Sequence, residues 1–135
     1  MVTLVDSCVL IDASSGSDGW KEISEQYIGQ CAAEGVLAIN CIVYAEVSVN
    51  FPSIENLDEF LPKNRYRRED IPLEAAFMAG KKIKDYKLQR KGKRNNPWPD
   101  LYIAAHAYTK SFRLLTKDKD MVKIFSDANV LLMEK

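Results

Sequence analysis

The chain has 135 residues, 47% of them hydrophobic and 28% charged, with a net charge of zero at pH 7. These values are typical of a single globular domain with a modest core. No apolar run is long enough to cross a bilayer, and no basic region precedes the first apolar segment, which argues against a signal peptide.

The three cysteines, Cys8, Cys31 and Cys41, are odd in number and lack metal-ligand spacing. This pattern argues against a disulfide framework or a zinc site. We therefore expect a cytoplasmic protein whose cysteines are small buried hydrophobic residues.

Charge is distributed unevenly along the chain. Residues 1–62 carry ten acids and one base, a net charge of −9, whereas residues 63–135 carry eighteen bases and nine acids, a net charge of +9. The densest basic segment, residues 81–94, holds eight bases and one acid. A charge run is usually a solvated helix face, but here the acids needed for offsetting i,i+4 pairs are nearly absent. We therefore predict a phosphate-binding surface, although charge alone does not choose between RNA, DNA and an acidic protein.

Apolar periodicity and helix-breaking residues predict strands that alternate with helices. In chain order, these are a strand at 2–5, a helix at 20–33, a strand at 36–39, helices at 41–49, 54–61, 73–90 and 99–109, a strand at 113–116, a helix at 119–125 and a strand at 130–133. This alternation predicts one α/β domain over residues 1–135, with a mostly parallel sheet of four to five strands flanked by helices.

Four acids lie near the carboxyl ends of predicted strands, where open α/β sheets place their functional groups. Asp6 follows the first strand, Glu46 lies on the helix after the second, Asp100 opens the helix before the third, and Asp118 follows the third. Three have ordinary alternatives, since Asp6 and Asp118 suit helix caps and Asp100 suits the first turn of a helix.

Glu46 is harder to explain as a surface residue. Its helical neighbours Ile42, Val43 and Val49 are apolar, and Lys21 is the only base before residue 63. A buried unpaired carboxylate costs several kcal/mol, and converging carboxylates take up protons unless a cation neutralises them. Oxygen ligands without His or Cys favour Mg²⁺ or Mn²⁺, which supports phosphodiester hydrolysis beside a basic surface.

Other chemically capable residues are predicted to be structural. His106, the single histidine, lies within an apolar helix and is predicted to be a core or interface residue with its hydrogen bonds satisfied, in preference to a general base. Asp12 and Asp120 are predicted to be solvated surface residues. Trp20 and Trp98 could stack on bases, but packing is the favoured interpretation.

Four segments of the sequence resemble the motifs of PIN domains. Residues 5–12 resemble the first motif, an Asp followed by Ser or Thr at a strand end, and residues 39–48 resemble the second, which carries a Glu. Residues 99–107 resemble the third, an Asp before an Ala-rich helix, and residues 114–118 resemble the fourth. The resemblance covers essentially the whole chain, and the size is similar to that of VapC-type toxins.

The resemblance implies a specific activity and specific partners. It implies an endoribonuclease that uses Mg²⁺ or Mn²⁺, cleaves structured RNA, is blocked by a cognate antitoxin protein and forms a homodimer. It gives catalytic and metal-binding roles to Asp6, Glu46, Asp100 and Asp118 and supporting roles to the hydroxyls of Ser7 and Thr116. Together with the basic segment, it makes Arg90, Lys91, Lys93 and Arg94 candidate RNA contacts.

Three alternatives stay open at this stage. The first is a catalytically silent PIN-like module that binds RNA or protein. The second is a receiver-like phosphoacceptor domain, although Asn40 stands at the strand end where such a domain needs Asp. The third is a DNase or flap nuclease, which generally needs more than 135 residues.

Overall fold

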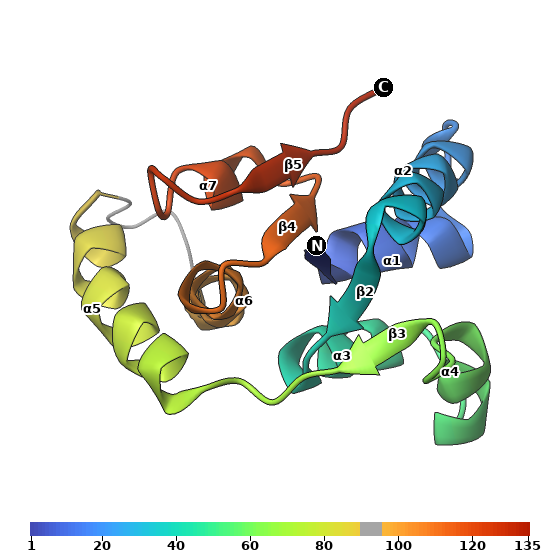
Figure 1. Ribbon diagram of the computed structural model, residues 1–135, viewed down its shortest axis with the longest axis horizontal. Helices are drawn as coiled ribbons and strands as arrows, with labels where there is room; N and C mark the ends of the chain where they lie inside the picture. Colours follow the sequence, from blue (N-terminus) through green and yellow to red (C-terminus); the bar gives the residue numbers. More distant parts are fainter. Residues whose placement is uncertain (90–95) are drawn as a thin grey trace.

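The computed structural model describes residues 1–89 and 96–135 (Figure 1). Within these residues, five strands form a single sheet: β1 (Val2–Val5), β2 (Val36–Ile39), β3 (Tyr66–Arg68), β4 (Arg113–Thr116) and β5 (Val130–Leu132). The strand order is β3-β2-β1-β4-β5, and every neighbouring pair is parallel. The predicted parallel sheet of four to five strands is confirmed.

The same residues form seven helices: α1 (Ser7–Ser15), α2 (Trp20–Glu34), α3 (Cys41–Ser48), α4 (Ile54–Phe60), α5 (Leu73–Gln89), α6 (Trp98–Thr109) and α7 (Lys119–Val122). Helix α1 and strand β3 were not predicted. The last helix ends at Val122, three residues earlier than predicted, because Lys123 already donates its backbone N–H to the Asp120 carbonyl in a tighter terminal turn.

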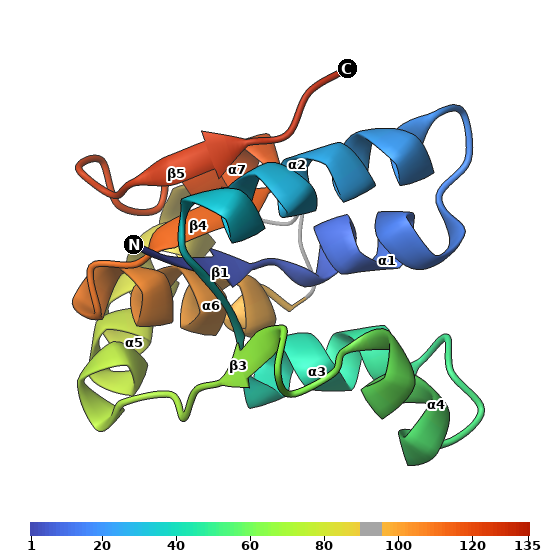
Figure 2. The same cartoon turned by 45° about the vertical axis from the view of Figure 1, so that its right-hand side comes forward.

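Helices cover both faces of the sheet. Figure 1 shows α1 and α2 on one side of the strands and α5 and α6 on the other, and the turned view in Figure 2 agrees. Strand β1 lies at the centre, where Leu4 pairs in register with Ala38 on one side and Leu114 on the other. Leu4, Val5 and Leu115 are fully buried between the two helical layers. Among the described residues, no helix is both long enough and apolar enough to span a membrane.

Gly35 ends α2, as predicted, for a steric reason. The backbone N–H of Val36 donates to the Met1 carbonyl oxygen at 2.8 Å, which starts the pairing of β1 with β2. A Cβ on Gly35 would lie only 2.0 Å from that same oxygen. Only glycine therefore allows the chain to leave α2 and enter the sheet at this point.

Because all strands are parallel, their carboxyl ends lie along one edge of the sheet. Asp6 follows β1, Asn40 follows β2 and Lys117 follows β4 at this edge. The fold thus places the residues after the three central strands side by side, which is the prerequisite for a shared site.

Candidate active site

Asp6 is held rigidly at the end of the central strand. It is the N-cap of α1, and its backbone N–H donates to the carbonyl oxygen of Leu115 at 2.9 Å. Its Oδ1 accepts a hydrogen bond from the backbone N–H of Ser7 at 2.8 Å. Its Oδ2 accepts from Thr116 Oγ1 at 2.6 Å and from Cys8 Sγ at 3.3 Å. Both carboxylate oxygens are therefore oriented by the surrounding chain.

The surroundings of Asp6 disfavour its negative charge. The residue is only 4% exposed, and burial, the largest effect, raises the pKa of its carboxyl because the charged form loses hydration. The hydrogen bonds from Thr116, Cys8 and Ser7 lower the pKa, while the nearby charge of Glu46 raises it further. A cation beside this carboxylate would favour the ionised form, so the oxygen donors fit a hard divalent ion.

Glu46 faces the same site from α3. It is half-buried, and its Oε1 accepts a hydrogen bond from Ser7 Oγ at 2.7 Å. The predicted apolar stripe around it is only partly present, since Val43 is buried but Val49 is 82% exposed. The sequence offers few local partners for Glu46 and suggests a cation, and the structure adds the hydroxyl of Ser7.

Thr116 connects Asp6 with Asp118. Its buried Oγ1 donates to Asp6 Oδ2 and accepts the backbone N–H of Asp118 at 3.1 Å. Asp118 is the N-cap of α7, and its Oδ1 accepts the backbone N–H of Asp120 at 2.9 Å. The helix-cap interpretations of Asp6 and Asp118 are therefore both confirmed. A cap occupies one lone pair of a carboxylate and leaves other acceptor sites for an ion.

Asp100 is the third residue of α6 and is half-buried. Its helix packs against α3, which carries Glu46, and against β4. Two prolines frame the start of α6, with Pro97 as N-cap and Pro99 in the first turn, where a missing N–H leaves no helical bond unmade. The helix begins at Trp98, one residue earlier than predicted.

Hydrogen bonds of Ser7 and Thr116 connect three of the four predicted acids. Ser7 contacts Asp6 and Glu46, and Thr116 contacts Asp6 and Asp118. Across residues 1–89 and 96–135, no three His, Cys, Asp or Glu side chains gather closely enough to hold a metal without rearrangement. Convergence of all four acids around an ion therefore stays a prediction.

Cys8 is a polar contact of the site that sequence reasoning missed. Its Sγ donates to Asp6 Oδ2 and accepts the backbone N–H of Lys117 at 3.5 Å. Burial and the charge of Asp6 raise the pKa of the thiol to about 12, so Cys8 is no nucleophile at neutral pH. The prediction of three buried cysteines holds for Cys31 and is wrong for Cys41, which is exposed because the first residue of α3 faces solvent.

Asp12 is likewise not a solvated surface acid. Its Oδ2 lies 2.6 Å from Lys117 Nζ, and its side chain is 14% exposed. The same ammonium group lies 4.5 Å from the ring centroid of Trp20, which confirms a packing role for that residue. Because Lys117 stands between Thr116 and Asp118, this ion pair ties α1 to the turn that carries both residues. The available signal for this ion pair in the sequence was a basic residue, Lys117, placed between the two motif residues Thr116 and Asp118.

The sequence of residues 3–128 matches the family of the PIN domain. The chain belongs to the PIN domain family. The match covers β1 through the turn before β5, so it includes every element that carries a predicted acid. The receiver-like interpretation is left without support.

Solved structures share the fold of this PIN domain over nearly its whole length. VapBC-1 from nontypeable Haemophilus influenzae is 22% identical, with a TM-score of 0.73 and 100% of each chain covered. VapBC2 from Rickettsia felis, bound to a DNA fragment from its promoter, is 19% identical, with a TM-score of 0.73 and coverage of 99% and 100%. VapC20 from Mycobacterium tuberculosis, a toxin that cleaves the sarcin–ricin loop, is 12% identical, with a TM-score of 0.63 and coverage of 90% and 93%. A search of curated proteins finds no match.

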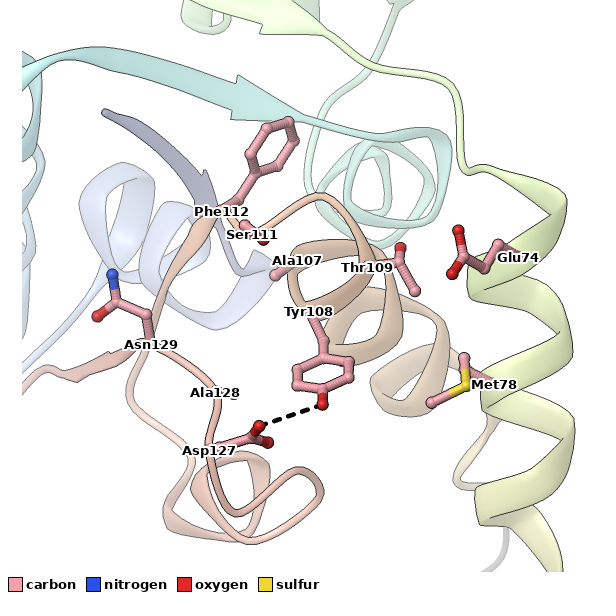
Figure 3. Close-up of a pocket in the computed structure, with 10 residues that line it drawn as sticks. All are labelled: Glu74, Met78, Ala107, Tyr108, Thr109, Ser111, Phe112, Asp127, Ala128 and Asn129. Carbon is pink, nitrogen blue, oxygen red and sulfur yellow. Dashed lines mark hydrogen bonds between the residues drawn. The ribbon is translucent and has the colours of Figure 1, made fainter.

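A cavity of about 430 Å³ lies away from the acids of the PIN domain. Figure 3 shows Tyr108 on α6 and Asp127 before β5 pointing toward each other in this cavity, where the Tyr108 hydroxyl donates to Asp127 Oδ2 at 3.3 Å. Ser111, Phe112 and Asn129, which precede strands, also line it. The cavity therefore lies at the edge where β4 and β5 begin, opposite the edge of Asp6, and does not belong to the candidate active site.

The predicted RNA contacts Arg90, Lys91, Lys93 and Arg94 lie outside the described residues. The described part of the basic segment is the end of α5, where Lys81 and Lys84 are exposed. Their helix packs against α6, which carries Asp100 in its first turn. An RNA-binding role for the segment stays a prediction.

Proposed function

We propose that this PIN domain is a metal-dependent endoribonuclease that hydrolyses phosphodiester bonds in structured RNA. The observation that carries the proposal is the hydrogen-bonded set formed by Asp6, Glu46, Asp118 and two hydroxyls at the carboxyl edge of a parallel sheet. Several carboxylates at such an edge suit a cation, and PIN domains are generally dependent on a divalent metal. The likeness to a toxin that cleaves the sarcin–ricin loop supports RNA as the substrate.

The residues proposed to hold the ion are Asp6, Glu46, Asp100 and Asp118. Their oxygens favour Mg²⁺ or Mn²⁺ over softer metals. When bound, such an ion supplies positive charge that stabilises a phosphoryl group during hydrolysis.

The protein's own groups prepare the site for that reaction. Thr116 and the Ser7 N–H keep the Asp6 carboxylate in one orientation, which limits the reorganisation of this group when substrate arrives. Ser7 Oγ fixes Glu46 in the same way. The basic half of the chain, with Arg90, Lys91, Lys93 and Arg94 as predicted contacts, holds the polyanion by charge.

The proposed biological role is that of the toxin in a toxin–antitoxin pair, in the cytoplasm. Support comes from the fold shared with VapBC complexes of two bacteria. Exposed apolar side chains are consistent with protein partners, which we propose are a cognate antitoxin and a second copy of the chain. On α5, Leu73 is 89% exposed and Phe77 62%, and near α4, Val49 and Ile54 are also exposed.

Cleavage of RNA by the purified protein tests the proposal. Total RNA is incubated with the chain in Mg²⁺, in Mn²⁺ or in chelator, and the ends are mapped by sequencing. We expect metal-dependent cuts that Asp100→Asn abolishes without loss of fold. Asp127→Asn, on the opposite edge of the sheet, is the matched control and should cut like the parent protein.

The outcomes separate the remaining alternatives. An Asp100→Asn variant that cuts RNA at the parent rate would show that the acid is wrongly assigned. RNA binding without cleavage in either metal would favour the catalytically silent module. Cleavage of DNA in place of RNA would assign the DNase activity.

A further inference from the structure

A buried hydrogen bond joins the two helices that carry Glu46 and Asp100. Asn40 Nδ2 lies 2.9 Å from His106 Nδ1, across 66 positions of sequence. Asn40 is 2% exposed and His106 is fully buried. The core position of His106 is confirmed, but its predicted full satisfaction is wrong, because its buried Nε2 has no hydrogen-bond partner in the described part of the chain.

A second hydrogen bond of Asn40 shows which atom donates and which accepts in its contact with His106. Its side chain caps α3 by accepting the backbone N–H of Val43 at 3.0 Å, which requires the oxygen to face that N–H. The NH₂ group must then face His106 Nδ1 and donate to it. His106 is therefore neutral, with its proton on Nε2. One side chain thus both starts α3 and attaches it to α6.

The contact between Asn40 and His106 lies the same number of residues from Glu46 on α3 as from Asp100 on α6. Glu46 comes six residues after Asn40 on α3, and Asp100 comes six residues before His106 on α6. At 1.5 Å per residue, each acid is about 9 Å along its helix from the contact. A rotation of about 10° at the contact would move each carboxylate by about 1.5 Å, more than an active site tolerates.

We propose that Asn40 and His106 are positioning residues, whose hydrogen bond sets the helix of Glu46 against the helix of Asp100. This inference rests on the proposed nuclease function of those two acids. Asn40 lies six residues before Glu46 and His106 lies six residues after Asp100, so the pair acts through the orientation of α3 and α6. The unmet Nε2–H of His106 is consistent with this role, because an apolar residue would fill the core at lower cost.

Protonation of His106 would break the contact. A proton on Nδ1 would face the NH₂ group of Asn40, and the amide could turn only by giving up the cap on Val43. Burial lowers the pKa of His106; the charge of Glu69, after β3, raises it, and that of Lys110, at the end of α6, lowers it. The contact should therefore be lost only in acidic solution.

Three variants separate this role from ordinary packing. Asn40→Ser keeps a good helix cap but cannot reach His106. His106→Phe keeps the ring and removes the acceptor. His106→Asn places an amide oxygen where Nδ1 stands, so it can still accept from Asn40, and it serves as the conservative rescue.

Steady-state cleavage of RNA is measured for each variant across pH, alongside melting temperature. We expect Asn40→Ser and His106→Phe to lower kcat by about ten- to a hundredfold with an unchanged KM, since small misplacements of reacting groups have effects of that size. His106→Asn should keep kcat within about threefold of the parent, and its kcat should fall less steeply than the parent's at acidic pH, where protonation of the acids still lowers the activity of both proteins. Parent-like kcat in the first two variants, or losses that only follow the fraction unfolded, would overturn the proposal.

Calorimetric titration with Mn²⁺ separates failure of this inference from failure of the proposed function. If the parent binds Mn²⁺ but cleaves no RNA, the nuclease proposal fails, and the positioning role is then read from Mn²⁺ affinity. About tenfold weaker binding by Asn40→Ser and His106→Phe, restored in His106→Asn, would support the role. If all three variants bind Mn²⁺ with the affinity of the parent, the positioning role is overturned. It is also overturned if the parent binds no Mn²⁺.

Discussion

Ser7 Oγ lies 2.7 Å from Glu46 Oε1, and this hydrogen bond joins α1 to α3 across 39 positions of sequence. The backbone N–H of the same serine donates to Asp6 Oδ1. One residue therefore orients two of the proposed metal-binding acids, one through its backbone and the other through its side chain. A Ser or Thr after the first Asp of the motif has a direct structural reason in this chain.

The first prediction concerns Ser7→Ala, which removes the contact to Glu46 but keeps the backbone N–H that donates to the Asp6 carboxylate. We expect kcat for RNA cleavage to fall about tenfold and the free energy of unfolding to fall by about 1 kcal/mol, the usual value of one hydrogen bond. Single-turnover kinetics and urea denaturation measure the two effects. Ser7→Thr, which keeps the hydroxyl, is the control; equal loss in both variants would contradict a hydroxyl role.

The second prediction concerns the stability of the metal-free protein against pH. Burial raises the pKa of Asp6 in the folded state, so the native state holds that proton more tightly than the unfolded state. Protonated Asp6 therefore favours the folded state. This contribution to the free energy of unfolding is fully present below the pKa of Asp6 in the unfolded chain, about 4, and is lost as pH rises through the higher pKa of Asp6 in the folded protein. At neutral pH, Asp6→Asn removes the buried charge and should stabilise the protein by about 1 kcal/mol, or about 3 °C in Tm.

Thermal melts of the parent and Asp6→Asn from pH 3 to pH 8 check this prediction. The two melting temperatures should diverge as pH rises, and Mn²⁺ should raise the Tm of the parent but not that of the variant. Asp127→Asn, an exposed acid elsewhere, should follow the parent at every pH. Parallel curves for the parent and Asp6→Asn would contradict the destabilising charge.

The third prediction concerns the ion pair between Asp12 and Lys117. Both side chains are substantially covered, so loss of one partner leaves a poorly hydrated charge. Asp12→Asn and Lys117→Met should each lower the free energy of unfolding by about 1–2 kcal/mol. The double variant should lose about 1 kcal/mol less than the two losses combined, as expected for groups in contact.

Urea denaturation of the four proteins in this double-mutant cycle gives the coupling energy. The exposed pair of Lys21 and Glu25, 3.8 Å apart on one helix, is the control and should show a coupling of no more than about 0.5 kcal/mol. A coupling energy near zero for Asp12 and Lys117 would mean that the ion pair does not hold α1 against the β4–α7 turn.

The fourth prediction concerns the basic segment. Charge reversal of Arg90, Lys91 and Lys93 should weaken RNA binding at low salt and reduce the dependence of log K on log salt by about 2, because each lost phosphate contact contributes about 0.7 for a single strand. Fluorescence anisotropy at several salt concentrations measures both quantities.

A second triple reversal, of Lys63, Arg65 and Lys135, changes the net charge equally at other positions. We expect it to alter affinity far less and to leave the salt dependence nearly unchanged. Equal effects of the two triple variants would mean that net charge, and no particular surface, governs RNA binding.

Local sequence patterns were sufficient to predict most of the strands and helices of the fold. The strands β1, β2 and β4 begin and end where the apolar runs predict, because each is buried on both faces and leaves a continuous hydrophobic signal. Strand β3 was missed because Arg67 and Arg68 are exposed at the sheet edge, so only Tyr66 carries an apolar signal. Its pairing with β2 depends on tertiary contact.

Helix α1 was not predicted, although Asp6 was recognised as a suitable helix cap. Asp6 is a good N-cap, and Val9, Leu10 and Ala13 follow at helical spacing and are buried. By contrast, nothing local indicates the strand order, in which β1 lies between β2 and β4 although β3 comes earlier in the chain than β4.

The sequence by itself determined the fold class, the family motifs and the four candidate acids, because periodicity and residue type act over a few neighbouring positions. Only the tertiary structure decided which groups meet: Ser7 with Glu46, Lys117 with Asp12, and Asn40 with His106. Each of these contacts spans 39 or more residues. Such contacts arise from the packing of whole helices on the sheet, which no local window of sequence records.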